Sequence, residues 1–348
     1  MANLIFRKPA IKGIVTTVGD RILTLEDQKQ QFDFSDDDIA KLKKNLGIVS
    51  KYVLSDLRFT ASDLCVQSAR QLLEKLDVKP EEIDAVIFVT QTPDYRAPST
   101  APNIASRLGC PPTTMAFDIS LGCSGFVYGL SIAFGLIEGN LSKVLLLTGD
   151  AASHYINPGD KTFAPLMGDA GSAILIDDSS KTPSHFCLYS DGTGSKSLYI
   201  PGSGTRQKES SDPDAGFMHM NGAEVFNFTI KVVPKMFDEI FAWANTDKDS
   251  VDYYVLHQPN KYILNNIKKR LGLPDSKIPS ETQSIYGNQN SASIPGTVNG
   301  FLSHQFQENQ IKSVIFAGFG IGLSWGACHV LIENIYAPAP LLFKIEEN

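Results

Sequence analysis

The chain has 348 residues, of which 43% are hydrophobic and 20% are charged, and its formal net charge is −7. This composition is ordinary for a globular protein with a substantial buried core. An acidic balance gives no general attraction to nucleic acid or to anionic membranes, so neither is predicted as a partner. The longest apolar runs, such as residues 144–147 and 313–317, are too short to span a bilayer.

The five cysteines are scattered, without a CxxC pair or other metal-like spacing. Their odd number argues against a disulfide framework, and the start of the chain, MANLIFRKP, resembles neither a secretory nor a transit segment. The sequence therefore predicts a protein of the reducing cytoplasm that binds no metal.

One pattern of elements occurs twice along the chain. In the first half an amphipathic helix and an acidic turn lead to a buried strand at residues 85–90, and in the second half the same order leads to a strand at 252–256. Each strand precedes a helix that closes on the tripeptide RLG, at residues 107–109 and 270–272. A small-residue turn, a helix and a final strand follow in both halves. Alternating strands and helices predict parallel sheets flanked by helices.

We therefore predict an α/β fold of two similar halves, residues 1–180 and 181–348, packed as a layered αβαβα core. Two βαβ units can look alike by chance, but the matched order of four elements favours a duplication. In such a layout, loops from the carboxyl ends of strands in both halves meet at one cleft. Catalytic residues are expected there.

Cys123 lies in the tight turn LGCSG, between a strand-like segment, AFDIS, and an apolar helix at residues 126–138. The positive end of a helix and its unpaired N–H groups lower a cysteine pKa toward the thiolate, which attacks thioesters. We therefore expect Cys123 to have a lowered pKa and to act as a nucleophile in the N-terminal half. The alternative is a buried structural cysteine.

Two residues of the C-terminal half complete a candidate site. His257 directly follows the strand DYYVL, which places it at the predicted cleft, although a structural histidine is the commoner case. Asn288 lies in SIYGNQNSASIPG, the counterpart of the cysteine turn, where an asparagine is often only a turn residue. Together, a thiolate, a histidine and an amide from three strand ends are typical of acyl transfer.

Six segments carry a family resemblance. They are LGCSGF with Cys123, LMGDAGSAIL, MNGAEVF, HQPN with His257, YGNQNSASIP with Asn288, and FGIGLSWG. In this order and at these spacings, over nearly the whole chain, they resemble the ketoacyl-acyl-carrier-protein synthase III family of condensing enzymes. The resemblance implies the thiolase fold and a Cys–His–Asn triad. It also implies that CoA or phosphopantetheine thioesters are substrates and that no cofactor stays bound.

The family's reaction implies that Cys123 takes an acyl group from a thioester. Malonyl-carrier protein then loses CO2, and the resulting enolate attacks the acyl-cysteine. His257 and Asn288 would donate hydrogen bonds to the malonyl thioester oxygen. The backbone amides of Cys123 and Ile321 would form the oxyanion hole, although the family commonly has glycine at the position of Ile321. Ala317 stands where degradative thiolases have a second cysteine, which disfavours a thiolase proper.

The resemblance also implies an acyl carrier protein as partner and a homodimer as the assembly. The positions that match the lining of the pantetheine arm are Gly222, Phe226 and Asn260. The helix after the histidine offers a candidate docking patch for an acidic carrier protein, made of Lys261, Lys268, Lys269 and Arg270. A merely solvated helix face is the alternative, and Tyr262 and Asn227 stand where the family often has basic residues.

Two departures concern the acyl donor, and a third position concerns the size of the acyl group. Lys41 aligns near the family's adenine-stacking tryptophan, and His154 aligns with the arginine on the other face of the adenine. Ala97 occupies a position where some members carry a bulky residue that closes the acyl pocket across the dimer. We therefore expect an acyl-carrier donor or a CoA held differently, and a primer longer or bulkier than acetyl.

Two other functions stay open on the sequence. The chain could pass the acyl group to an oxygen or nitrogen nucleophile in a polysaccharide or specialised-metabolite pathway, or it could be a non-catalytic partner of an active synthase. The presence of both His257 and Asn288 favours decarboxylative condensation, in fatty acid or related acyl-chain biosynthesis. The presence of Cys123 argues against an inactive partner.

Overall fold

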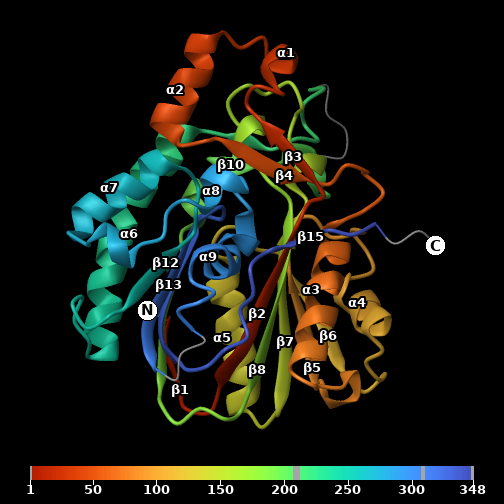
Figure 1. Cartoon of the computed structure of the whole chain (residues 1–348), viewed down its shortest axis with the longest axis vertical. Helices are drawn as coiled ribbons and strands as arrows, with labels where there is room; N and C mark the ends of the chain where they lie inside the picture. The colour runs from red at the N-terminus through yellow and green to blue at the C-terminus, as the bar shows by residue number, and fades with distance from the viewer. Residues whose placement is uncertain (1, 207–211, 307–309, 346–348) are drawn as a thin grey trace.

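Two β-sheets, one in each half, form the frame of the protein (Figure 1). The computed structural model describes residues 2–206, 212–306 and 310–345. The strands of the first sheet are β2 (Ala10–Val18), β5 (Ala85–Val89), β6 (Met115–Ile119), β7 (Lys143–Asp150), β8 (Ala170–Asp177) and β15 (Leu341–Leu342). Those of the second are β1 (Ala2–Phe6), β9 (Ser184–Ser190), β12 (Tyr253–Leu256), β13 (Lys312–Gly320) and β14 (Ser324–Ile332). Their orders are β15-β2-β8-β7-β5-β6 and β1-β9-β14-β13-β12.

Helices form the other three layers. Between the sheets lie α5 (Gly125–Glu138) and α9 (Ser293–Phe301). The first sheet is covered outside by α3 (Ala61–Lys75) and α4 (Ala101–Leu108), and the second by α6 (Gly222–Ala244) and α7 (Lys261–Leu271) (Figure 1). Above the sheets lie α1 (Lys29–Phe32), α2 (Asp36–Leu46), α8 (Thr282–Ile285) and the short strands β3 (Arg21–Thr24), β4 (Ser50–Val53), β10 (Leu198–Tyr199) and β11 (His219–Met220). The predicted αβαβα layering is confirmed.

The repeated RLG tripeptide ends a helix in both halves, as predicted. Helix α4 ends at Gly109 with φ of 85°, and α7 ends at Gly272 with φ of 63°. Glycine adopts this left-handed conformation without a Cβ clash, so the same residue stops both helices for the same reason.

The predicted parallel sheets are mixed instead, so this part of the prediction is wrong. Strand β5 pairs in parallel with β6 and β7, and β12 pairs in parallel with β13. The short strand β15 is also parallel to β2, whereas the other pairs of these two sheets are antiparallel, including β7 with β8 and β13 with β14. Only residues 321–323 join β13 to β14, and a connection this short joins antiparallel strands only.

The two ends of the chain cross between the halves. Strand β1 pairs with β9 in the second sheet, whereas β15 pairs with β2 in the first. A boundary after residue 180 does separate β8 from β9, but it assigns both terminal strands to the wrong sheet. The division into two domains stays a prediction. The exchange means that each sheet contains a strand from the other end of the chain.

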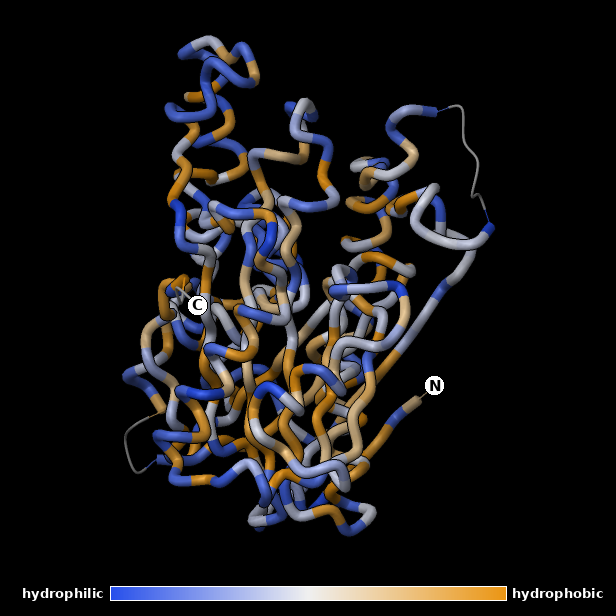
Figure 2. Tube along the Cα trace, turned by 90° about the vertical axis from the view of Figure 1, so that its right-hand side faces the viewer, coloured by the Kyte–Doolittle hydropathy of each residue, from blue (hydrophilic) through white to orange (hydrophobic). Residues whose placement is uncertain are grey.

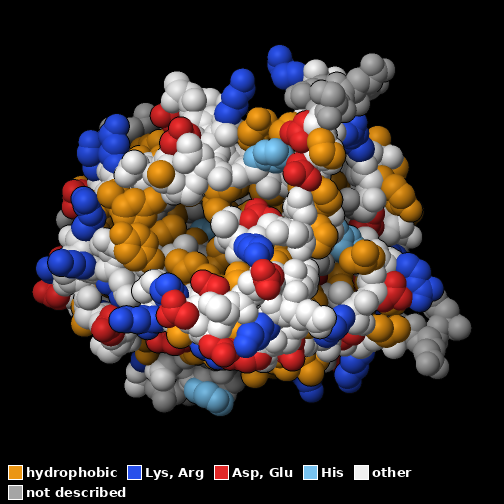
Figure 3. Space-filling view, turned by 90° about the horizontal axis from the view of Figure 1, so that it is seen from above, with side chains coloured by type: hydrophobic (Ala, Val, Ile, Leu, Met, Phe, Trp, Pro, Cys, Tyr) orange, Lys and Arg blue, Asp and Glu red, His pale blue; other side chains and the backbone are white. Residues whose placement is uncertain are grey.

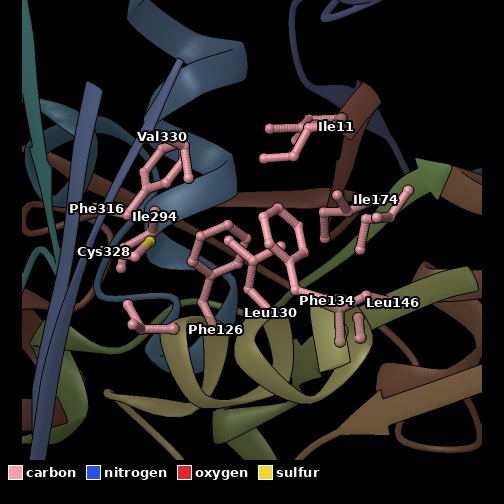
Figure 4. Close-up of a cluster of buried hydrophobic side chains, with 14 of the residues drawn as sticks. Ile11, Phe126, Leu130, Phe134, Leu146, Ile174, Ile294, Phe316, Cys328 and Val330 are labelled. Carbon is pink, nitrogen blue, oxygen red and sulfur yellow. The ribbon is translucent and has the colours of Figure 1, made fainter. Parts of the chain in front are cut away.

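Helix α5 is apolar on most of its surface because it is packed between both sheets. Phe126 of α5 contacts Phe316 of β13 edge to face, with ring centroids 5.2 Å apart. On the side of the first sheet, the same helix packs against Leu146 and Ile174 (Figure 4). Hydrophobic residues are concentrated along the sheets and the helices between them, whereas the uppermost part of the chain is mainly hydrophilic (Figure 2).

Replacing Phe126 with alanine is expected to lower the free energy of unfolding by about 3–5 kcal/mol, because the fully buried ring leaves a cavity between the halves. Chemical denaturation followed by circular dichroism measures the change. Ile132→Ala on the same helix is the control, because Ile132 is 38% exposed, and it is expected to cost under about 1 kcal/mol. Equal losses in both variants would contradict this packing.

Candidate active site

Cys123 lies in the loop between β6 and α5, directly before Ser124, the N-cap residue of the helix. The backbone N–H groups of Cys123 and Ile321 both face its sulfur and act to lower the pKa of the thiol. Ile321 belongs to the turn between β13 and β14. A Cβ atom on the preceding Gly320 would lie only 2.7 Å from Sγ, so this close approach requires a glycine. The structure thus brings the two predicted oxyanion-hole amides together.

The expected lowering of the Cys123 pKa is wrong for this arrangement. Burial raises the pKa of the thiol to about 12, and the buried carboxylate of Asp150 adds to the rise. The two backbone amides oppose burial only in part. Cys123 also precedes the N-cap, outside the first helical turn where the dipole acts most strongly. At neutral pH the predicted nucleophile, Cys123, is therefore a neutral thiol.

His257 follows β12 directly, as the sequence predicted. Its side chain is 2% exposed, and Nδ1 lies 2.7 Å from the hydroxyl of Ser293 at the start of α9. Burial lowers the pKa of His257 to about 3, opposed in part by a hydrogen bond to the backbone of Asn290. The imidazole is therefore neutral throughout the physiological pH range.

Asn288 does not follow a strand, contrary to prediction, but lies in the loop after α8. Two backbone hydrogen bonds fix it to the neighbouring loop: its N–H donates to Leu166 O at 2.7 Å, and its carbonyl accepts from Gly168 N at 3.1 Å. Its Oδ1 accepts from the N–H of Asn290 at 3.0 Å. Within the described residues Nδ2 has no hydrogen-bond partner, so this donor is available to a ligand.

Cys123, His257 and Asn288 line one narrow cavity of about 70 Å³, so the predicted convergence of the three residues is confirmed. Met220, which is 38% exposed, lies at its mouth beside residues of α6 and α7. Seen from above, hydrophobic side chains gather around a hollow on the side where these helices lie (Figure 3).

Asn290, which the sequence analysis did not single out, is hydrogen-bonded to each of Cys123, His257 and Asn288. Its Oδ1 accepts a hydrogen bond from the thiol of Cys123, with Sγ and Oδ1 3.2 Å apart. Its N–H donates to Asn288 Oδ1, and its backbone is hydrogen-bonded to His257. The backbone of Asn290 is left-handed, with φ of 49°, a conformation that asparagine tolerates. The sequence signal that could have indicated Asn290 is its position two residues after Asn288 in the segment YGNQNSASIP.

Two further polar residues of the cavity also escaped prediction. Asn290 Nδ2 donates to Gln91 Oε1 at 3.2 Å and makes a longer contact of 3.5 Å with Tyr155 Oη. Gln91 comes two residues after the end of β5, so the strand-end rule that selected His257 could have found it. Tyr155 lies in an irregular segment, and no sequence pattern indicated it.

Asp150, at the end of β7, accepts hydrogen bonds from Gln91 and from Ser291, the residue after Asn290. Its two oxygens accept from Gln91 N at 2.7 Å and from Ser291 Oγ at 2.6 Å. Burial raises the pKa of Asp150 to about 6, although these hydrogen bonds oppose the rise. The carboxyl group thus joins the end of β5 to the loop that carries Asn288 and Asn290.

The structure separates the three residues predicted to line the pantetheine arm. Asn260 lines the cavity, and its Oδ1 caps α7 by accepting from Ile263 N at 2.9 Å. Gly222 is the exposed first residue of α6 and does not line the cavity. Phe226 packs its ring on Tyr262, with centroids 5.2 Å apart, near the mouth.

One of the four residues of the predicted docking patch is buried. Lys261, Lys269 and Arg270 are exposed on α7, but Lys268 is 9% exposed. Its Nζ donates to Asp275 Oδ1 at 3.0 Å and to Ser280 Oγ at 2.7 Å, so Lys268 is a structural cation and not a docking residue.

The three positions linked to the acyl donor lie outside the cavity of the single chain. Lys41 is exposed and forms an ion pair with Asp37, one turn earlier on α2. His154 is exposed at the end of a short 3₁₀ turn. Ala97 is exposed in the loop between β5 and α4. A role for Ala97 in an acyl pocket therefore depends on a second copy of the chain.

Comparisons with known proteins identify the family of the chain. A family model described as 3-oxoacyl-[acyl-carrier-protein (ACP)] synthase III matches residues 117–192, and the model of its C-terminal part matches residues 241–332. A putative 3-oxoacyl-[acyl-carrier-protein] synthase 3 of Campylobacter jejuni is 32% identical over 98% of this chain and 99% of its own. The β-ketoacyl-[acyl-carrier-protein] synthase III of a Synechocystis species is 33% identical over 91% and 96%.

A solved structure is similarly close. The 3-oxoacyl-(acyl-carrier protein) synthase of Burkholderia xenovorans LB400 superimposes with a TM-score of 0.92 at 31% identity, covering 98% of each chain. The fold and the relatives together show a thiolase-fold condensing enzyme, a class of transferase. More narrowly, the chain belongs to the 3-oxoacyl-[acyl-carrier-protein] synthase III family.

The raised pKa of Cys123 predicts how its alkylation depends on pH. Because the thiol stays protonated well above neutral pH, the rate of its reaction with iodoacetamide should rise about tenfold per pH unit from pH 6 to 9. Peptide mass spectrometry distinguishes Cys123 from Cys110, the other partly exposed cysteine, with Cys123→Ser as control. An alkylation rate that stops rising by pH 7.5 would contradict this prediction. It would show that the helix end lowers the pKa of Cys123 more than burial raises it.

Proposed function

We propose that this chain is a decarboxylative condensing enzyme that joins an acyl group held on Cys123 to the malonyl unit of malonyl-carrier protein. The product is a β-ketoacyl-carrier protein, for fatty acid or related acyl-chain biosynthesis in the cytoplasm. The observation that carries this proposal is the single cavity in which a thiol, a neutral imidazole and a free amide donor meet.

Acylation needs only the thiol and the two backbone amides. The sulfur of Cys123 bonds to the acyl carbon of a CoA or phosphopantetheine thioester, and the thiol proton leaves with the departing carrier thiol. The N–H groups of Cys123 and Ile321 face the sulfur and stabilise the oxyanion that forms on the acyl oxygen. The acyl-cysteine then waits for the second substrate.

Condensation uses the two side-chain donors. In the tautomer that carries its proton on Nε2, the neutral imidazole of His257 accepts from the Ser293 hydroxyl at Nδ1 and donates from Nε2 to the malonyl thioester oxygen. Asn288 Nδ2 is the second donor. Loss of CO2 leaves an enolate that these donors stabilise, each by about 3–4 kcal/mol. The enolate carbon attacks the acyl carbon, the sulfur of Cys123 leaves, and a proton from solvent restores the thiol.

The assembly that we propose is a homodimer. Strand β6 is the edge of its sheet and pairs only with β5 among the described residues, and its Met115 is 41% exposed. An exposed, partly apolar edge strand is suited to pairing with a second copy. The loop with Ala97 follows the neighbouring strand β5, so this contact would bring Ala97 toward the partner. Its small side chain leaves room for a primer larger than acetyl.

Substitution of the two donors should separate the half-reactions. His257→Ala and Asn288→Ala are each expected to lower condensation by about 10²–10³-fold while Cys123 still takes up the acyl group, because the donors act on the malonyl unit. Intact mass spectrometry follows acylation by a panel of acyl-CoA and acyl-carrier donors. Added malonyl-carrier protein should discharge the adduct only in the wild type.

Cys123→Ser is the control for acylation at the proposed nucleophile. An adduct that malonyl-carrier protein cannot discharge even in the wild type would contradict condensation. It would favour transfer of the acyl group to an oxygen or nitrogen nucleophile instead. No adduct with any donor would favour an inactive partner subunit.

The exposed cations of α7 are expected to attract the acidic carrier protein. The double variant Lys269→Glu/Arg270→Glu should raise the KM for malonyl-carrier protein several-fold and weaken its salt dependence, because exposed rim charges act mainly on association. The KM for malonyl-pantetheine should not change. Lys75→Glu on α3, on the far side of the protein, is the matched control, and an equal effect there would refute docking on α7.

A further inference from the structure

Part of the cavity wall beyond the nucleophile is polar. Gln91, Tyr155 and Asn290, which we call the polar wall, all line the cavity that contains Cys123. They are joined in series: the thiol donates to Asn290 Oδ1, and Asn290 Nδ2 contacts both Gln91 Oε1 and Tyr155 Oη. The mouth lies on the side of α6 and α7, so an arm entering there carries its acyl group toward the polar wall.

Two donors of the polar wall have no acceptor. The hydroxyl hydrogen of Tyr155 and the Nε2 group of Gln91 find no acceptor among the described residues, although Tyr155 is only 7% exposed. A plain alkyl chain would cover these donors without accepting a hydrogen bond from them. Burying a polar group in this way costs free energy. A ligand with an acceptor oxygen would satisfy them.

Acylation creates a complementary need. Among the described residues, the thiol of Cys123 is the only side-chain group that donates a hydrogen bond to Asn290 Oδ1. Acylation of the sulfur removes the thiol hydrogen and therefore this hydrogen bond. Asn290 is 3% exposed, so its oxygen would then be buried without a donor. A group that donates to Asn290 and accepts from Tyr155 or Gln91 meets both requirements. A hydroxyl group does this through a single atom.

The surroundings limit the charge and size of the acyl group. The carboxylate of Asp150 lies directly behind Gln91, bonded to its backbone N–H at 2.7 Å, and disfavours an anionic acyl group. The remaining walls near the polar wall are apolar and include Phe163, Leu166 and Met167. They suit a short hydrocarbon remainder and not a polyol.

We propose that the primer carried on Cys123 is a short, neutral hydroxyacyl group, whose hydroxyl lies within the first few carbons beyond the thioester and bonds the polar wall. This inference rests on the proposed acyl-enzyme function and names its substrate class. It differs from the expectation of a merely longer primer, because the polar wall selects for a functional group and not for length.

The direct test compares matched donors. Purified protein is incubated with butanoyl-CoA, both enantiomers of 3-hydroxybutanoyl-CoA, 4-hydroxybutanoyl-CoA and the corresponding acyl-carrier proteins, and the rate of Cys123 acylation is followed by intact mass spectrometry. At least one hydroxyacyl donor is expected to react at least tenfold faster than butanoyl on the same carrier. Equal or faster reaction of butanoyl would overturn the proposal.

Variants of the polar wall connect the preference to these residues. Tyr155→Phe and Gln91→Leu should each reduce the hydroxyacyl-to-butanoyl rate ratio toward one, because they remove a donor and keep the approximate shape. Leu166→Met, an apolar position in the same cavity, is the matched control and should change both rates by the same factor. A ratio unchanged in both polar-wall variants would overturn the assignment.

The outcomes separate this inference from the function on which it rests. Acylation by butanoyl as fast as by every hydroxyacyl donor leaves the acyl-enzyme intact and refutes the hydroxyacyl primer alone. No adduct with any donor refutes the acyl-enzyme function, and with it the inference.

Discussion

The sulfur of Cys123 packs against the turn between β13 and β14, and the rest of the site is arranged around this contact. A Cβ atom on Gly318 would lie 2.8 Å from the carbonyl oxygen of Cys123, and one on Gly320 would lie 2.7 Å from Sγ. Because both positions are glycines, the turn of the C-terminal half places the N–H of Ile321 against the sulfur of Cys123, which belongs to the N-terminal half. The cavity is therefore lined by residues of both halves and depends on their packing together.

Burial also decides the electrostatics of the site. Desolvation keeps Cys123 as a thiol and His257 as a neutral imidazole, so with Asn288 the three predicted catalytic side chains carry no charge at rest. Charge then develops only during the reaction, on an oxyanion or an enolate. Donors fixed beforehand in a poorly solvated cavity stabilise such charge more strongly than water does. A neutral resting site is thus suited to a reaction in which decarboxylation generates the carbanion without a strong base.

Local features of the fold and site could be predicted because local sequence causes them. The glycines that end α4 and α7, the buried strands β5 and β12, and the placement of Cys123 and His257 follow from periodicity and turn chemistry. The antiparallel pairs of β2 with β8 and of β9 with β14, and the crossing of β1 and β15, depend on partners far away in the chain, which no local pattern encodes. Lys268 was misassigned for a similar reason, since Asp275 and Ser280 compete for its ammonium group.

Asn290 shows why a site predicted one residue at a time is incomplete. Its side chain holds the thiol, its N–H holds the side-chain oxygen of Asn288, and its backbone bonds His257. The side chain and the main chain of this residue, whose backbone is left-handed, thus contact different neighbours. Residues that share a partner do not contribute independently, so substitutions at the nucleophile and at either donor act on one hydrogen-bonded unit. The three predicted catalytic side chains are accordingly not isolated, because the loop that carries Asn288 and Asn290 connects them and is itself held by hydrogen bonds to Asp150.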